Sequence, residues 1–423
     1  MPVKSRISSI VLYSVISAAF IGPGTITTSV TAGATFGLQL LWAVTLGTLG
    51  CLVLQEIAAR TVIASGLNLR QAAEMGLGKP GILMIGTTGI VVMLGCAAYE
   101  AGNILGAVSG LNILTGFEMG WLTLAVVLAV FAILWFNKRN LISGIMTFLV
   151  ALMGIAFISL AIEQPYAPLE LLRSAAVPHF PHGSALIVLG LVGTTIVPYN
   201  IFLGSGISHG KTIAEMRLGL AVSVLTGGFI TGAIVVAGTA VDAFASFPEL
   251  ANQLHDEMGV VGTWALGVGL FAAGFSSSVT APYAASLVAA TLWGWDKAQK
   301  LRWVWGMVLM VGFLFGISGI KPIPVILTVQ ALNGFILPLL AAVLILLVNH
   351  KKVLQDAQLP GWFYLMAMLA VFFSVTIIGL NQIEKVFIAA GWTTGFGMLF
   401  LGGIAMSCTL LLGYFIWRAR SSA

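Results

Sequence analysis

The sequence is poor in charged residues for its length. Asp, Glu, Lys and Arg make up only 8% of the 423 residues, whereas a soluble domain contains about a quarter. Apolar residues make up 59%, and apolar runs of about 18 or more residues, long enough to cross a bilayer as helices, recur along the chain. These features exclude a soluble fold and predict an all-α polytopic membrane protein that is embedded in the lipid bilayer.

Motifs typical of several other protein classes are also missing. The three cysteines, Cys51, Cys96 and Cys408, lie in separate apolar segments without a CxxC pair, which argues against disulfides and cysteine metal sites. The chain has no P-loop and no room for a soluble domain between its apolar runs, so ATP-driven transport is not indicated. The net charge of +5 lies in short loops, which argues against a nucleic-acid partner. We therefore expect neither an enzyme nor a cofactor.

The apolar runs predict about twelve transmembrane helices in a single transporter domain, residues 1–423. We expect a first repeat at about 9–162, a second at about 184–348, and two extra helices at about 361–417. If the N-terminus is cytoplasmic, most of the 19 Lys and Arg residues fall on the cytoplasmic side, as the positive-inside rule requires. The exceptions are Arg173, Lys321 and Lys385. We expect both termini in the cytoplasm and the chain in a bacterial inner membrane.

Two of the predicted spans are interrupted by proline at corresponding positions. "IGPGT" at 21–25 contains Pro23 and Gly24, and "IVPYN" at 196–200 contains Pro198. Proline cannot complete the helical hydrogen-bond ladder and disfavours helix in the residue before it. The freed main-chain groups need partners or a polar cavity inside the membrane. Five spans separate the breaks, which predicts an inverted repeat whose discontinuous helices 1 and 6 share a midplane site. The alternative is two simple kinks.

Several ordered segments make the sequence resemble the Nramp family of divalent-metal transporters. The resemblance covers most of the chain, and it implies a LeuT-type 5+5 inverted repeat and secondary active transport by alternating access. The segments that carry it are "TAGATFGLQLLW" (31–42), "LQEIAARTVIASGLNLRQAAE" (54–74), "GTTIVPYNIFLGS" (193–205), "GFSSSVTAPYA" (274–284) and the spacing from Gln330 to Pro338.

The metal-ligand positions of the family are altered in this sequence. The resemblance implies an Asp and an Asn ligand in the first helix, where this chain has Gly22 and Thr25, and a Met ligand in the sixth, where it has Val197. Glycine has no side chain and valine cannot ligate, so only a neutral hydroxyl remains. A divalent ion without a nearby acid is costly at the bilayer midplane. We therefore predict no complete set of metal ligands.

The remaining polar groups define the expected substrate site. We assign substrate binding to Gly22, Thr25, Val197, Asn200 and Gln330. Such a site suits a hard cation that keeps waters, and the resemblance makes a divalent cation the first prediction. The alternatives are a monovalent cation or a non-metal solute. The helix start after Gly24 offers free N–H groups, which would favour the carboxylate of a small organic acid or amino acid.

Glu100 is the one acid that we place deep within a span. An intramembrane acid is functional by default, and the resemblance aligns Glu100 with a family glutamate near the proton route. However, the family's neighbouring Asp position is Ala97 here, and its sixth-helix His position is Tyr199. Glu100 is therefore a candidate for coupling substrate symport to protons, with sodium as another possible coupling ion. The alternative is a protonated, hydrogen-bonded glutamate in a packed interface.

Two further groups have structural and functional interpretations. Glu56 and Arg60 are four residues apart on a predicted helix, and we expect a structural or gate ion pair. The eighth span carries small hydroxyl residues, which favour close helix packing, with contact to an ion or water as the alternative. These residues are Ser276, Ser277, Ser278 and Thr280.

Overall fold

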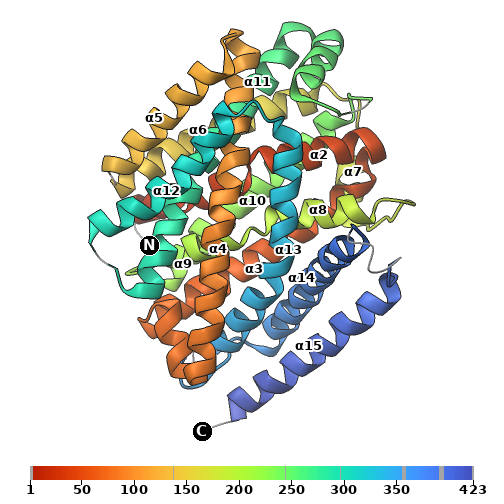
Figure 1. Cartoon of the computed structure of the whole chain (residues 1–423). Helices are drawn as coiled ribbons and strands as arrows, with labels where there is room; N and C mark the ends of the chain where they lie inside the picture. Colours follow the sequence, from red (N-terminus) through yellow and green to blue (C-terminus); the bar gives the residue numbers. More distant parts are fainter. Residues whose placement is uncertain are drawn as a thin grey trace.

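The computed structural model describes residues 3–136, 138–242, 244–295, 297–354, 359–389 and 395–421. Within these ranges the regular structure is helical (Figure 1). Ten helical segments are long and apolar enough to cross a membrane, and Ser5–Phe20 and Ile336–Val348 are shorter apolar helices. The predicted all-α membrane architecture is confirmed.

The first half of the chain contains seven helical elements in sequence order. These are α1 (Val3–Phe20), α2 (Pro23–Phe36), the short 3-10 helix η1 (Gly37–Leu40), α3 (Leu41–Ser65), α4 (Leu69–Thr115), α5 (Met119–Phe136) and α6 (Arg139–Ile162). A short helix, α7 (Pro168–Ala176), then leads into the second half.

The second half follows the same order of elements. It comprises α8 (Ala185–Thr195), α9 (Pro198–Ile207), α10 (Ile213–Gly238), α11 (Phe247–Trp293), α12 (Ala298–Ile317) and α13 (Pro322–Val348). Two more helices follow, α14 (Trp362–Ala389) and α15 (Met398–Ser421). If α1 and α2 count as one broken span, and α8 and α9 as another, the chain has the twelve spans that the sequence predicts.

Both predicted helix breaks are present. Pro23 and Pro198 each occupy the first turn of a new helix, where the missing N–H costs no hydrogen bond. The residues before them are extended, with φ −105° and ψ −179° at Gly22 and φ −93° and ψ 124° at Val197. The prolines therefore end one helix and begin the next, rather than kinking a continuous one.

A second pair of matched breaks was not anticipated. The long helices α4 and α11 each bend at a glycine with positive φ, Gly78 and Gly259, both at φ 64°. Only glycine adopts this conformation at little cost. Three residues later, Gly81 and Gly262 pack so tightly that a Cβ atom would lie 2.3 Å from a carbonyl oxygen of the preceding turns in each case. The two halves of the chain thus share glycine breaks as well as proline breaks.

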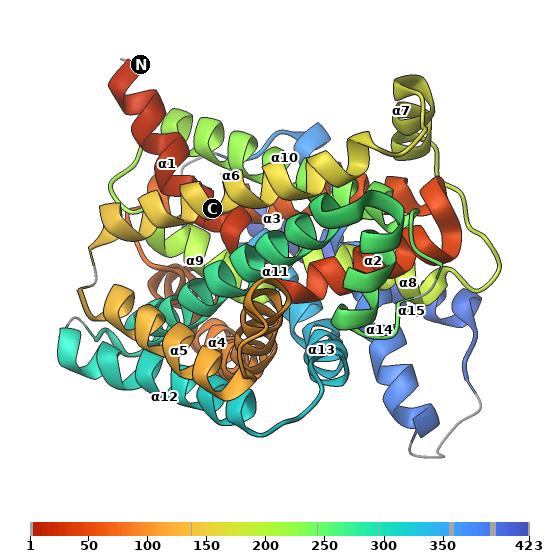
Figure 2. The same cartoon turned by 90° about the horizontal axis from the view of Figure 1, so that it is seen from above.

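Helices α4, α5, α11 and α12 pack against one another and form a four-helix group (Figure 2). Its centre is the contact between α4 and α11, the equivalent helices of the two halves. A Cβ atom on Gly274 would lie 2.2 Å from the main-chain nitrogen of Ala107, and one on Gly110 would lie 2.4 Å from that of Phe271. Small residues therefore bring the two backbones into direct contact, as is common between membrane helices.

Candidate functional site

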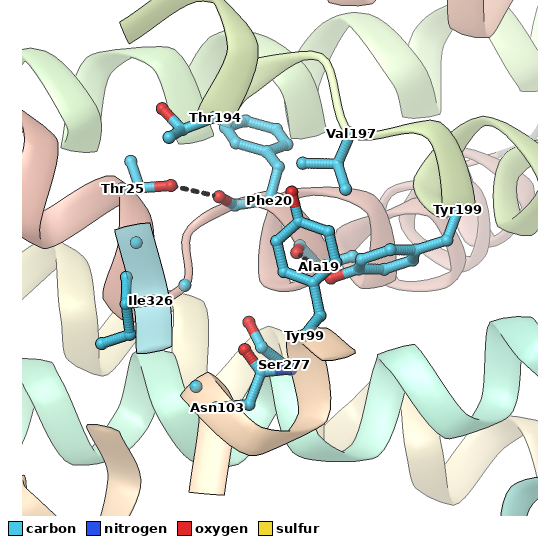
Figure 3. Close-up of a pocket in the computed structure, with 13 residues that line it drawn as sticks. Ala19, Phe20, Thr25, Tyr99, Asn103, Thr194, Val197, Tyr199, Ser277 and Ile326 are labelled. Carbon is cyan, nitrogen blue, oxygen red and sulfur yellow. Dashed lines mark hydrogen bonds between the residues drawn. The ribbon is translucent and has the colours of Figure 1, made fainter. Parts of the chain in front are cut away.

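The two proline breaks meet at one small cavity (Figure 3). The segment between α1 and α2 and the segment between α8 and α9 form two of its walls, and α4, α11 and α13 complete it. The cavity has a volume of about 30 Å³, which is enough for about two waters. The residues at its surface are Ala19, Phe20, Gly22, Gly24, Thr25, Tyr99, Gly102, Asn103, Thr194, Val197, Tyr199, Ser277 and Ile326.

Main-chain oxygens that the first break frees are bound by side chains at the cavity. The Tyr199 hydroxyl donates to the carbonyl of Ala19 at 2.7 Å. The Thr25 hydroxyl donates to the carbonyl of Phe20 at 2.5 Å (Figure 3). Each hydroxyl uses its only hydrogen to donate to the backbone, so it can only accept hydrogen bonds from, or offer a lone pair to, a species in the cavity.

Behind the cavity surface, carbonyls in the last turn and a half of α1 accept hydrogen bonds from side chains of α11 and α9. The Ala18 carbonyl accepts hydrogen bonds from the hydroxyls of Ser276 at 3.0 Å and Ser277 at 3.4 Å. The side-chain amide of Asn200 donates to the Ile16 carbonyl at 3.1 Å. Ser276 and Ser277 of α11 therefore satisfy the backbone of the broken helix, whereas Ser278 and Thr280 donate to carbonyls of α11 itself.

Gly22 faces polar groups of α4 and α11 rather than an acid. A Cβ atom at this position would lie 3.1 Å from the Ser277 hydroxyl and 3.7 Å from the Asn103 amide oxygen. The Asn103 amide nitrogen in turn lies 3.5 Å from a carboxylate oxygen of Glu100. A side chain at residue 22 would therefore meet the Ser277 hydroxyl and the Asn103 amide, and the Glu100 carboxylate lies behind that amide.

Glu100 itself is fully buried and does not reach the surface of the cavity. Its Oε2 faces Asn103, and its Oε1 has no hydrogen-bond partner among the described residues. A buried carboxylate oxygen without a partner is costly when the group is ionised. The position suits a group that takes up a proton or a cation.

The structure brings only some of the predicted substrate-binding residues together. Gly22, Thr25 and Val197 line the same cavity. Asn200 is buried behind it, and its side-chain oxygen has no hydrogen-bond partner among the described atoms. The side chain of Gln330 lies outside the described part of the chain, and α13 contributes Ile326 to the cavity.

Sequence reasoning assigned no place in the site to Asn103 or Tyr99, and it named Ser277 for helix packing, with contact to an ion or water as the alternative. Asn103 and Tyr99 come from α4, and Ser277 comes from α11. A signal for Asn103 was present, because it follows Glu100 by three residues and therefore shares its helix face. No local pattern indicated that the ring of Tyr99 packs edge-on against Tyr199, with centroids 5.6 Å apart. That contact joins α4 to α9.

A second polar cluster joins three helices away from the cavity. The predicted pair is present, with Arg60 Nη2 2.6 Å from Glu56 Oε1. Glu56, whose side chain is only 8% exposed, also accepts hydrogen bonds from Arg217 at 3.1 Å and from the Tyr364 hydroxyl at 3.0 Å. We call Glu56, Arg60, Arg217 and Tyr364 the Glu56 cluster. It links α3 to α10 and α14, two contacts that sequence spacing did not reveal.

The described residues contain no group of three or more His, Cys, Asp or Glu side chains that could hold a metal ion. The cavity is instead lined by hydroxyl, amide and main-chain groups together with apolar side chains. The site is therefore neutral at its surface.

Comparison with known sequences places this site in a family. Residues 14–384 match the family described as natural resistance-associated macrophage protein-like, Nramp. The divalent metal cation transporter MntH of Caldanaerobacter subterraneus subsp. tengcongensis is 25% identical over 363 residues, which cover 81% of this chain and 85% of the relative. MntH of Yersinia pestis is 24% identical over 384 residues, covering 86% and 91%.

Solved structures agree on the fold. A mutant of the manganese transporter of Eremococcus coleocola superposes with a TM-score of 0.77 at 18% identity, covering 98% of this chain and 94% of that one. MhsT in complex with L-phenylalanine, a protein of the LeuT fold, superposes with a TM-score of 0.60 at 15% identity, covering 88% and 97%. The broken helices, the repeated order of elements and the matched family together make this chain a membrane transporter of the Nramp family with a LeuT-type fold.

Proposed function

We propose that this protein is a secondary active transporter that carries a divalent cation with part of its water shell retained. Transport occurs by alternating access, and the cation binds in the cavity between the breaks of α1/α2 and α8/α9. The relatives named above as divalent metal cation and manganese transporters support the class of substrate. The observation that carries the proposal is that Gly22 stands beside the Ser277 hydroxyl and the Asn103 amide in a cavity whose lining contains no charged side chain.

The chemistry of the cavity supports retained waters. Thr25 and Tyr199 already donate to main-chain carbonyls, so they offer only neutral lone pairs to a cation. A dication held by such groups alone would lack a counter-charge in a medium where burying charge is costly. Waters kept in its first shell spread the charge and bridge to the neutral oxygens, which is how Mg²⁺ is often bound.

Coupling and gating are assigned to the two acidic positions. We propose Glu100 as the group that exchanges a proton during symport; Asn103, at the edge of the cavity, donates a hydrogen bond to its carboxylate and connects it to the site. Sodium is the other candidate coupling ion. We propose the Glu56 cluster as a gate on the cytoplasmic side, because it ties the ends of α3, α10 and α14 together. We propose in addition that both termini lie in the cytoplasm, that the protein resides in a bacterial inner membrane and that it does not use ATP; the distribution of Lys and Arg supports this orientation.

A second candidate function is favoured by the helix starts at the cavity. Helices α2 and α9 both begin there with proline in the first turn and without a side-chain cap. Their N-termini carry positive potential, which suits a carboxylate. The alternative substrate is therefore a small organic acid or amino acid, and a monovalent cation is a third possibility that neutral oxygens can hold.

Uptake into proteoliposomes separates these substrates. We expect saturable uptake of Mn²⁺ or Mg²⁺, because the site retains oxygen ligands for a hydrated hard cation. The panel includes Na⁺, amino acids and organic acids, with protein-free liposomes as the control. Saturable uptake of an organic solute without any cation flux would refute the proposal and support the second candidate.

Restoring a carboxylate in the cavity tests the location of the site. Gly22→Asp is expected to tighten Mn²⁺ binding by at least about tenfold, or about 1.4 kcal/mol, because it adds a charged ligand next to the cation. Gly22→Asn is the matched control, since it has the same shape without the charge. Isothermal titration of the purified protein measures both. Equal affinities for the two variants would place the cation elsewhere.

Removing the charge of Glu56 tests the gate. Glu56→Gln leaves both Arg60 and Arg217 without their charged partner. Losing one partner of a buried ion pair costs about 3 to 5 kcal/mol of stability. We expect a smaller loss here, because the Arg217 side chain is 57% exposed and water can solvate its charge. We expect faster hydrogen exchange at the starts of α10 and α14, with more opening on that side.

The control for this experiment is Glu74→Gln, which removes an exposed acid from α4. A lower melting temperature with an unchanged exchange pattern would instead assign the Glu56 cluster a purely structural role.

A further inference from the structure

An aromatic and basic surface lies where α5 ends and where α11 connects to α12. It contains the indole rings of Trp135, Trp295 and Trp303 and the cations of Lys297, Lys300 and Arg302. We call these six residues the Trp–Lys patch. Figures 1 and 2 both show the end of α5 beside the start of α12, at the left edge of the molecule. The transport proposal makes no use of this surface.

Contacts between rings and cations hold the patch in place. The Arg302 guanidinium lies 4.1 Å from the centroid of the Trp135 ring, and the Lys300 ammonium lies 5.2 Å from that of Trp295. Cation–π contacts at these distances are attractive and leave the donor groups free on their other side. The cations are therefore positioned without being neutralised.

The three cations of the patch outnumber the acids near them in the sequence. The sequence has no Asp or Glu from 119 to 162 or from 297 to 355, and Asp296 is the one acid between α11 and α12. Asp296 lies outside the described residues. Among the described residues, Lys297, Lys300 and Arg302 form no ion pair, because both ion pairs found involve Glu56. The patch thus carries a local excess of positive charge.

The start of α12 makes this excess more costly. Lys297 precedes the helix, Lys300 and Arg302 lie in its first turns, and its first turn contains no acidic residue. Cations at a helix N-terminus are repelled by the positive end of the helix dipole. A bound anion would relieve that repulsion.

We infer that the Trp–Lys patch binds the headgroup of an anionic phospholipid such as phosphatidylglycerol. Exposed tryptophans mark the level of the membrane interface, and Trp303 is 71% exposed. Clusters of Lys and Arg directly beside a membrane span attract anionic lipids at that level. The phosphate binds between Lys297, Lys300 and Arg302, and the indole rings lie among the upper acyl chains.

The location of the patch suggests what the lipid does. The patch belongs to α5, to α12 and to the segment that joins α11 to α12, at the end of the four-helix group. Helices α4 and α11 of this group also line the cavity, but none of the six patch residues does. A lipid bound at the patch therefore anchors the four-helix group to one leaflet without contacting the cavity.

Native mass spectrometry of the full chain released from nanodiscs tests the inference. The nanodiscs contain equal amounts of phosphatidylglycerol and phosphatidylethanolamine. We expect the wild type to retain at least about fivefold more phosphatidylglycerol, and about 0.5 M salt to reduce this preference because it screens exposed charges. No preference between the two lipids would overturn the inference.

A pair of matched variants locates the binding. Lys297→Gln with Lys300→Gln removes two charges from the patch, and Lys351→Gln with Lys352→Gln removes two from another loop outside the patch. Because these positions are exposed or partly exposed, we expect both double variants to fold. We expect the first double variant to lose most of the preference and the second to keep it. Equal retention by the two would refute the assignment to the patch.

Discussion

The need to satisfy main-chain hydrogen bonds inside a membrane governs the arrangement around the substrate site. Two prolines end helices within apolar spans, where the freed carbonyls must find hydrogen-bond donors in the protein or in a polar cavity. In this protein the chain supplies the donors itself. Tyr199 binds the carbonyl of Ala19, Thr25 binds that of Phe20, and Ser276 and Ser277 bind that of Ala18. Side chains thus complete the backbone at the first break.

The same hydrogen bonds change what the cavity can hold. Each hydroxyl that donates to the backbone presents only a neutral lone pair to a substrate. With Gly22 in place of an acid, the surface of the cavity has no charged group, and the carboxylate of Glu100 lies behind Asn103. A cation in the cavity would therefore contact neutral hydroxyl and amide groups, and the Glu100 carboxylate would lie farther away, behind Asn103. This order favours an ion that arrives with waters over one that must exchange its whole shell for protein ligands.

Much of the fold could be predicted because proline and apolar length act locally. Pro23 and Pro198 identified both breaks, and the spacing of Glu56 and Arg60 identified their ion pair. The glycine breaks at Gly78 and Gly259 were missed, because a glycine near a charged residue such as Lys79 or Glu257 indicates a loop as readily as a bend within a helix. The parts of the site that depend on long-range contacts were also missed. The bond from Tyr199 to Ala19 spans 180 residues, and that from Tyr364 to Glu56 spans 308.

We propose that a cation in the cavity keeps waters in its first shell because charged ligands are absent there. Electron–nuclear double resonance of Mn²⁺ bound to the purified protein in deuterated water counts the waters in its first coordination shell. We predict that water fills most of the coordination positions, with neutral oxygens of the chain completing the shell. A first shell composed mainly of protein ligands, with one water or none, would contradict the account.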